Sequence, residues 1–345
     1  MIALALLTGG WVVYLMVNQE PLPPIGIADR TSNINVLLTR PNDWKKIAEA
    51  PVISEEDMTI LDGSTATIPV TAELYRQFFG YTDYEIERNG VVLHTTTHYA
   101  YLKLIDRDNR FVSKPGSREV SLIFVTQPSD EEKAYAQSKG VELELTPIAL
   151  DGFVFITHKD NPVESLTVEQ IQGIYTGQIK NWSEVGGEDL EIRPYQREQN
   201  SGSQTAMEQM VMQGKQMLLP LQTRAKDDMY YGMGELIEAV AEFENGPASI
   251  GYTYYYYINN LYKNENIKVI KISGIAPTND NLISGTYPFS TYYYAVMRAG
   301  EPEDSPARIL RDYLVSAEGQ ELIAMAGYCT VNNGDSVPVD NSEQE

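Results

Sequence analysis

The residues with the clearest chemical potential lie in one polar stretch near the middle of the chain, residues 195–204. Arg197 offers a planar fork of N–H donors that matches the geometry of an oxyanion, and Ser201 and Ser203 add hydroxyl donors. Gly202 lets the backbone turn tightly between them, so successive backbone N–H groups can point into one concavity. These groups together predict a cradle for a tetrahedral anion.

A helix is expected directly after this stretch. Ser201 is its predicted N-cap, and Gln204 completes an S-x-x-Q capping box. Apolar side chains then recur at helical spacing, at Ala206, Met207, Met210 and Val211. The positive end of the helix dipole would face the anion. An ordinary capped helix behind a loop with a solvated arginine explains the same local pattern. The choice between this interpretation and an anion site therefore depends on the rest of the chain.

Length and charge narrow the class of protein. A chain of 345 residues exceeds what one core usually supports, so two lobes or domains are expected. The net charge of −22 argues against nucleic acid and anionic lipid as partners. It also opposes electrostatic steering of an anion, but salt screens surface charges beyond about 8–10 Å, so a buried site remains possible. A lone Cys329 and three histidines argue against disulfides and metal sites, and no cofactor or metal is expected.

The two ends of the chain differ from its middle. Residues 1–17 are apolar-leaning and uncharged, and we expect 1–19 to be an uncleaved membrane anchor, with a cleaved secretory signal as the alternative. Either segment would place the remainder outside the cytoplasm, tethered to the outer face of the cell membrane in the first case. A Pro-rich, polar linker is expected over 20–57, and a disordered acidic tail over 334–345.

Between these ends, buried strands alternate with capped helices. The continuous apolar run at 120–125 is typical of a strand buried on both faces, and Ser129 with Glu132 forms a capping box after it. Further strands are expected at 143–150, 152–156, 267–272 and 292–297, and a final helix from Pro306 through Leu322. This alternation predicts an α/β fold with mostly parallel sheets.

Loops rich in hydroxyl groups precede several of the expected helices, at 64–67, 126–129 and 201–203. Ligands of open α/β sheets bind outside the carboxyl ends of the strands. Two lobes that face each other across a cleft would let such loops converge on one anion. We expect a first lobe over 58–150, a second over 151–288, and a return segment with the C-terminal helix over 289–333. The chain would cross between lobes near 150–153 and 287–292.

Three segments in combination resemble the PstS-type phosphate-binding proteins of ABC importers. They are DGSTATIP at 62–69, IFVTQPS at 123–129 and REQNSGS at 197–203. Shorter matches, among them NPV at 161–163 and IYTG at 174–177, follow in the same order, and the similarity spans roughly residues 58–330. The resemblance implies a two-lobed type II periplasmic-binding-protein fold that closes on phosphate, with an ABC permease as the membrane partner.

The resemblance also implies which residues bind phosphate. Carried over to this chain, the ligand-binding positions are Ser64, Thr65, Thr67, Ile68, Thr97 (or its neighbour Thr96), Gln127, Arg197, Ser201, Gly202 and Ser203. One position departs from the family pattern, which places an acidic residue in the third loop to accept the proton of hydrogen phosphate. Gln127 occupies the nearest position here, and a neutral amide gives a weaker preference for phosphate over sulfate.

Two other functions remain open. A membrane-tethered sensor would keep the same fold and report the oxyanion to a partner instead of feeding a permease. An enzyme would use Ser201 or Ser203 as a nucleophile, but the chain has no G-x-S-x-G elbow, and His98 and His158 have no evident orienting partner. No catalytic residue is therefore expected.

Overall fold

The computed structural model describes residues 44–47, 51, 53–92, 94–107, 119–220, 233–241 and 246–331. The predicted anchor, most of the predicted linker and the predicted acidic tail lie outside these residues. Within the described part of the chain, no helix has both the length and the apolar character needed to cross a membrane. Part of the predicted linker packs against the folded chain. Ile47 is buried, and its backbone N–H donates to Gln77 Oε1.

The elements of the first half of the chain begin with β1 (Ile60–Gly63), η2 (Thr65–Thr67), α3 (Ile68–Phe79), α4 (Asp83–Asn89), α5 (Thr97–Asp106), β2 (Val120–Val125) and α6 (Asp130–Ser138). They continue with β3 (Leu143–His158), β4 (Ser165–Leu166), α7 (Val168–Thr176), η3 (Trp182–Val185) and β5 (Arg193–Pro194).

The second half begins with α8 (Gly202–Ala206), η4 (Met207–Met212), α9 (Met233–Ala241), η5 (Gly246–Ala248), β6 (Ser249–Tyr254) and η6 (Tyr257–Leu261). It ends with β7 (Ile267–Ile272), α10 (Asn279–Ile283), β8 (Ser290–Arg298), α11 (Pro306–Val315), α12 (Ala317–Met325) and β9 (Cys329–Thr330).

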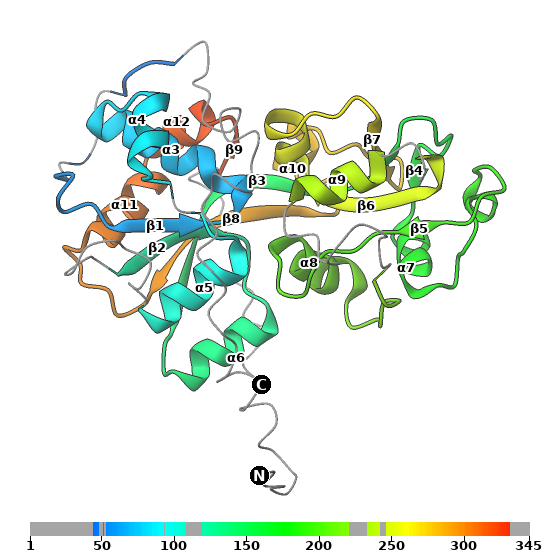
Figure 1. Ribbon diagram of the computed structural model, residues 1–345, viewed down its shortest axis with the longest axis horizontal. Helices are drawn as coiled ribbons and strands as arrows, with labels where there is room; N and C mark the ends of the chain where they lie inside the picture. Colours follow the sequence, from blue (N-terminus) through cyan, green and yellow to red (C-terminus); the bar gives the residue numbers. More distant parts are fainter. Residues whose placement is uncertain are drawn as a thin grey trace, which may run out of the picture.

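The elements form two lobes that are joined by the long strands β3 and β8 (Figure 1). We call residues 44–150 and 290–331 the first lobe and residues 151–289 the second lobe. The sheet runs β1-β2-β8-β3-β6-β5, with β4, β7 and β9 attached beside this path. Parallel pairs occur in both lobes, β1 with β2 and β5 with β6, whereas every pair that involves β3 is antiparallel. The sheet is therefore mixed, because β3 and β8 pass between the lobes in opposite directions.

Strand β3 is one continuous strand of 16 residues, where two shorter strands were expected. It pairs with β8 up to the pair Gly152–Ser290, and from Phe153 onward it pairs with β6. The change of partner falls within the expected crossover at 150–153. At this crossover, Asp151 Oδ1 accepts the Gly152 N–H at 2.7 Å. The strand needs a glycine here, because a Cβ atom on residue 152 would lie only 2.9 Å from the Leu282 side chain.

The apolar run of β2 is buried on both faces, as its composition predicts. Leu122 and Phe124 belong to the core that α3 covers, whereas Ile123 and Val125 pack with Tyr101 of α5 on the other face. Alternation along the strand explains this division, because successive side chains of a strand point to opposite faces of the sheet. Helices on both faces therefore hold the carboxyl ends of β1 and β2 in place.

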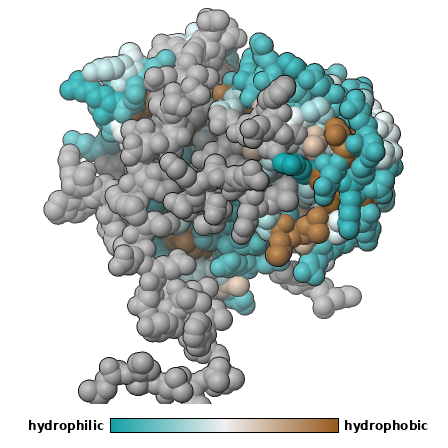
Figure 2. All heavy atoms as spheres, turned by 45° about the vertical axis from the view of Figure 1, so that its right-hand side comes forward, coloured by the Kyte–Doolittle hydropathy of each residue, from teal (hydrophilic) through white to brown (hydrophobic). Residues whose placement is uncertain are grey.

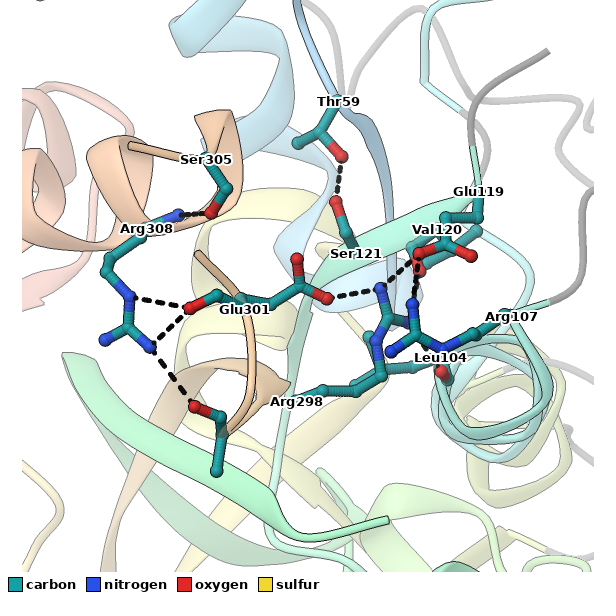
Figure 3. A network of polar contacts seen from close by, with 11 residues as sticks. Thr59, Leu104, Arg107, Glu119, Val120, Ser121, Arg298, Glu301, Ser305 and Arg308 are labelled. Carbon is teal, nitrogen blue, oxygen red and sulfur yellow. Dashed lines mark hydrogen bonds and ion pairs between the residues drawn. The ribbon is translucent and has the colours of Figure 1, made fainter. Parts of the chain in front are cut away.

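Arg298, the last residue of β8, stabilises the opposite end of the first-lobe sheet, where the antiparallel strand β2 begins (Figure 3). Its guanidinium donates to the carbonyl oxygens of Leu104 at 2.7 Å and Val120 at 2.9 Å. It also forms ion pairs with Glu119 and Glu301. One buried cation thereby joins α5, β2 and the loop that follows β8, far from the loops at the carboxyl ends of β1 and β2.

Two helices differ from their predicted form. The final helix divides into α11 and α12 at Ser316. The backbone of Ser316 is extended, which ends α11, and its hydroxyl caps α12 by accepting the Gly319 N–H. The helix after residue 201 is regular only to Ala206 and continues as the π-helical turns of η4. Ser201 caps it, but Gln204 does not complete the predicted capping box. Its side chain instead donates to Glu208 and accepts from Tyr252.

The face of the second lobe turned forward in Figure 2 is mostly hydrophilic, with small apolar patches between the polar side chains. The large aromatic side chains are in the interior instead, where Trp182, Tyr175, Tyr252, Phe153 and Phe155 are fully buried. The aromatic content of the chain thus serves largely as core.

Candidate oxyanion-binding site

A small cavity of ≈ 30 Å³ lies where the two lobes meet. The first lobe lines it with Ser64, Thr65, Thr96, Thr97 and Thr126, and the second lobe with Arg197, Glu198, Ser201, Gly202, Ser203 and Tyr254. Pockets for organic ligands usually enclose roughly 300–1,000 Å³, so this cavity suits an ion of a few heavy atoms. Hydroxyl groups dominate its lining, and Arg197 and Glu198 are its charged members.

The first hydroxyl loop follows directly from the end of β1 and is held from behind. Thr67 Oγ1 donates to Phe124 O at 2.7 Å, and His94 Nδ1 donates to Ser64 O at 2.6 Å. Burial lowers the pKa of His94, and its Nε2 lies 2.8 Å from the Thr71 hydroxyl, which can donate to it. A neutral imidazole with its proton on Nδ1 thus supports Ser64 and Thr65 at the cavity wall.

The second loop, which leads into α5, carries backbone strain at the cavity. Thr96 has φ 83° and ψ 161°, a region that β-branched residues rarely adopt. The loop is tied to the end of β1 by Asp62, whose carboxylate accepts from the Thr95 backbone N–H at 2.7 Å and from the Thr95 hydroxyl at 2.8 Å. Lys103 pairs with the same carboxylate at 3.0 Å. The strained residue is therefore fixed in position by its neighbours.

On the second lobe, two tyrosines of β6 hold the loop that contains Arg197. Tyr252 OH accepts the Arg197 backbone N–H at 3.0 Å and donates to the Gln204 side chain, and burial raises its pKa. Tyr254 OH donates to Gly202 O at 2.9 Å. These bonds fix the loop on a buried strand, as a preformed binding site requires.

Arg197 and Glu198 form a bidentate ion pair in the lining. Arg197 Nε lies 3.0 Å from Glu198 Oε2, and Arg197 Nη2 lies 2.8 Å from Glu198 Oε1. Burial opposes the charge of Arg197, but the Glu198 carboxylate outweighs this effect and raises the pKa of the guanidinium. Arg197 therefore stays charged, and its charge is partly balanced before any ligand enters.

Two buried hydroxyl groups face this space. Ser203 is only 3% exposed, and its Oγ has no hydrogen-bond partner among the described residues. The Thr126 hydroxyl is similarly buried and lies beside the Tyr254 hydroxyl, where it helps to lower a tyrosine pKa that burial raises. Because a buried hydroxyl without a partner is costly, the Ser203 hydroxyl is available to donate to an anion in this cavity.

Close approach of the lobes at this point requires a glycine. A Cβ atom on Gly202 would lie 2.6 Å from Thr126 Oγ1 and 2.8 Å from Thr97 Oγ1. Both threonines belong to the first lobe, and Gly202 belongs to the second. The structure therefore has the two lobes closed around the cavity.

The structure brings most of the predicted site residues together. Ser64, Thr65, Thr97, Arg197, Ser201, Gly202 and Ser203 line the cavity. Three predicted residues do not: Thr67 is buried behind the first loop, Ile68 is in the core, and Gln127 is exposed, with its amide donating to Tyr294 OH at 3.1 Å. Gln127 points away because it follows Thr126 at the end of β2, and neighbouring residues of an extended chain face opposite ways.

Three lining residues, Thr126, Glu198 and Tyr254, were not among the predicted site residues. Thr126 and Glu198 each adjoin a predicted residue, so the sequence contained the right loops but not the direction of each side chain. Tyr254 begins the run of four tyrosines at 254–257. Its ring does pack, beside Phe153 and Tyr293, while its hydroxyl reaches the cavity.

Fold and site together define a two-lobed binding protein with an anion-sized cavity between its lobes, and comparison with known proteins agrees. A family model described as a PBP superfamily domain matches residues 109–318, more than half of the chain. The chain belongs to the PBP superfamily.

Relatives within this superfamily include phosphate-binding proteins. The phosphate-binding protein PstS of Borreliella burgdorferi is 25% identical over 185 residues, which are 53% of this chain and 64% of that protein. PstS of Staphylococcus saprophyticus is 28% identical over 207 residues, which are 57% of this chain and 62% of that protein. The matches thus span less than two thirds of the length of these relatives. The resemblance to PstS-type proteins is confirmed.

Solved structures support the fold. A Clostridium perfringens substrate-binding protein with bound phosphate aligns with a TM-score of 0.57 and 24% identity, covering 80% of this chain and 100% of that one. The predicted α/β fold with two lobes is thereby confirmed.

Proposed function

We propose that this chain binds inorganic phosphate, or a similar tetrahedral oxyanion, in the cavity between its lobes. The observation that carries the proposal is the convergence of Arg197 and the unpartnered, buried Ser203 hydroxyl with threonine hydroxyls from the other lobe. Hydroxyl and guanidinium donors suit an oxyanion, and a small cavity between lobes that touch at Gly202 shields it from part of the solvent. The names of the PstS relatives agree with this ligand.

Glu198 gives the site a means of preferring phosphate. Hydrogen phosphate carries a proton that a carboxylate can accept, whereas sulfate carries none at neutral pH and would be repelled. Glu198 would thus take the role of the acidic residue that the family pattern places in the third loop, where this chain has the neutral Gln127. Its pairing with Arg197 leaves lone pairs on both carboxylate oxygens for such a bond.

Titration calorimetry of the full chain, dialysed free of phosphate, tests this function. Phosphate and arsenate should bind, and sulfate should bind at least about 100-fold more weakly, because a site built around one hydrogen bond rejects an analogue without it. Arg197→Ala should raise the Kd for phosphate by about 100-fold or more, since it removes a buried charged donor. Arg193→Ala, an exposed arginine on the same lobe, is the matched control. Undiminished binding by Arg197→Ala would refute the site.

In the cell, we propose that the chain acts outside the cytoplasm, tethered by residues 1–19, and delivers phosphate to an ABC importer. A sensor would have the same ligand, fold and location. Its ligand-bound form would signal to a partner instead of delivering phosphate to a permease. The names of the PstS relatives support the ligand. The Clostridium perfringens protein is named as the substrate-binding protein of a phosphate ABC transporter, which supports delivery.

A further inference from the structure

Beside the cavity, two hydrogen bonds join the lobes without contacting the proposed ligand space. Asn200 Nδ2 of the second lobe donates to Glu131 Oε2 of the first lobe at 2.7 Å. Gln209 Nε2 of the second lobe donates to Pro128 O of the first lobe at 3.2 Å. Asn200, Glu131 and Gln209 border an open groove of ≈ 660 Å³ and do not line the cavity itself. The bonds can therefore act on closure without touching the ligand.

Asn200 adopts a sparsely populated backbone conformation that asparagine tolerates better than most residues. Its φ is 63°, in the left-handed region, and its side chain is 6% exposed. Its Oδ1 atom is buried and has no hydrogen-bond partner among the described residues. Within the same part of the chain, the one hydrogen bond found for this side chain is the bond across the cleft. Separation of the lobes would break this hydrogen bond, so the bond stabilises only the closed form.

Glu131 is suited to the opposite side of the contact. It lies in the first turn of α6, directly after the loop that carries Thr126 to the cavity. Its carboxylate makes the bond to Asn200 charge-assisted, and such bonds are about twice as strong as neutral ones. Asn200 directly precedes Ser201, the N-cap of α8. The pair therefore bridges the two loops that line the cavity from opposite lobes.

We propose that Asn200 and Glu131 form a latch that stabilises the closed form and thereby sets the affinity for the ligand. This inference rests on the proposed function. A ligand that needs the closed form has an apparent Kd equal to its intrinsic Kd divided by the closed fraction, so weakening the latch raises the Kd. Because the latch forms only after the lobes meet, its loss should increase the dissociation rate and leave the association rate nearly unchanged.

Reversing donor and acceptor tests the latch. Asn200→Asp places two carboxylates in contact and should raise the Kd for radiolabelled inorganic phosphate about tenfold in the full chain, through faster dissociation. Adding Glu131→Gln restores a donor opposite the new carboxylate and should return the Kd to within about threefold of the original. Aspartate tolerates the left-handed region as asparagine does, so the loop conformation is preserved. Glu142→Gln, on the same lobe and exposed, is the control for removal of a charge.

Small-angle X-ray scattering of the ligand-free protein separates failure of the latch from failure of the proposed function. Asn200→Asp should increase the radius of gyration, and the double variant should reverse the increase. If the unsubstituted chain does not bind phosphate, the proposed function fails, and the scattering alone decides whether the latch exists. An Asn200→Asp variant with unchanged Kd and radius overturns the latch. A double variant that does not recover shows instead that Asn200 acts only within its own loop.

Discussion

At the scale of single residues, the cavity depends on the absence of a side chain at Gly202 as well as on its polar groups. Gly202 brings the backbone of one lobe against two threonines of the other, and the Ser203 hydroxyl next to it is buried with no partner in the described part of the chain. Arg197 and Glu198 balance each other until a ligand arrives. The site is therefore nearly neutral, and most of its donors are hydroxyl groups that can rotate to suit an oxyanion.

Gly202→Ala should abolish closure without unfolding the protein. The new methyl group would clash with Thr97 and Thr126 only when the lobes meet, and alanine is the better helix former by about 0.5–1 kcal/mol. We expect calorimetry to show phosphate binding weakened at least about 100-fold, with an unchanged or higher melting temperature. Gly300→Ala, which would meet nothing within 4 Å, is the control. Normal binding by Gly202→Ala would mean that closure at this point is not required.

At the scale of elements, strand β3 is the connection that matters most. It changes partner from β8 to β6 after Gly152, and the buried carboxylate of Asp151 lies at that point. Asp151 Oδ1 accepts from the backbone N–H groups of Gly152 and Tyr256, which join β3 to the segment after β6. Burial raises the pKa of Asp151 to about 7, and these two bonds offset the effect only in part.

This raised pKa makes stability depend on pH. Between the ordinary value of 3.8 and about 7, the folded chain holds a proton that the unfolded chain has released. The free energy of unfolding therefore falls as pH rises through this window, by roughly 1.4 kcal/mol for each pH unit, and the fall levels off above pH about 7. Below the window, Asp151 is neutral in both states and costs nothing.

Asp151→Asn should remove this dependence, because the amide keeps an acceptor for both backbone N–H groups and carries no charge. Urea unfolding at pH 5 and pH 8 should show the variant gaining stability relative to the unsubstituted chain at the higher pH. Asp280→Asn, an exposed residue of α10, should show no such difference. A variant that loses stability equally at both pH values would show that Asp151 is charged throughout or that its proton is needed for packing.

At the scale of the whole molecule, the lobes share one hydrophobic core. Residues of α3, β3, β6 and α12 belong to the same buried cluster, so a closing motion would bend a continuous structure at the strands that join the lobes. The net charge of −22 repels anions at long range. The proposed capture of phosphate would therefore rely on short-range donors in the cavity and not on long-range attraction.

Phosphate uptake by a strain that lacks this chain distinguishes delivery to an importer from signalling to a partner. If it delivers phosphate, a deletion strain should lose most uptake of radiolabelled phosphate at low external concentration, and a gene copy carrying Arg197→Ala should fail to restore it. A copy carrying Arg193→Ala should restore it. Uptake that persists in the deletion strain, together with a changed response to phosphate starvation, would favour the sensor.

Local sequence chemistry was sufficient to identify several of the elements and the loops that line the cavity. The run at 120–125 is buried on both faces, the capping box at Ser129 forms as predicted, and the loops at 64–65, 97 and 197–203 meet at one cavity. These features depend on neighbouring residues: on the period of apolar side chains, on caps that bond within one turn, and on hydroxyl and guanidinium groups close together in sequence.

Only the tertiary structure decided which side chain of each loop faces the cavity and how the long strands run. Thr126 and not Gln127 points inward, because the direction of each side chain is set by where β2 ends against β8. The strand at 143–158 is continuous because β8 and β6, which lie far along the chain, successively pair with it. Contacts between distant parts of the chain leave no local pattern, and for that reason the latch between Asn200 and Glu131 became visible only in the folded molecule.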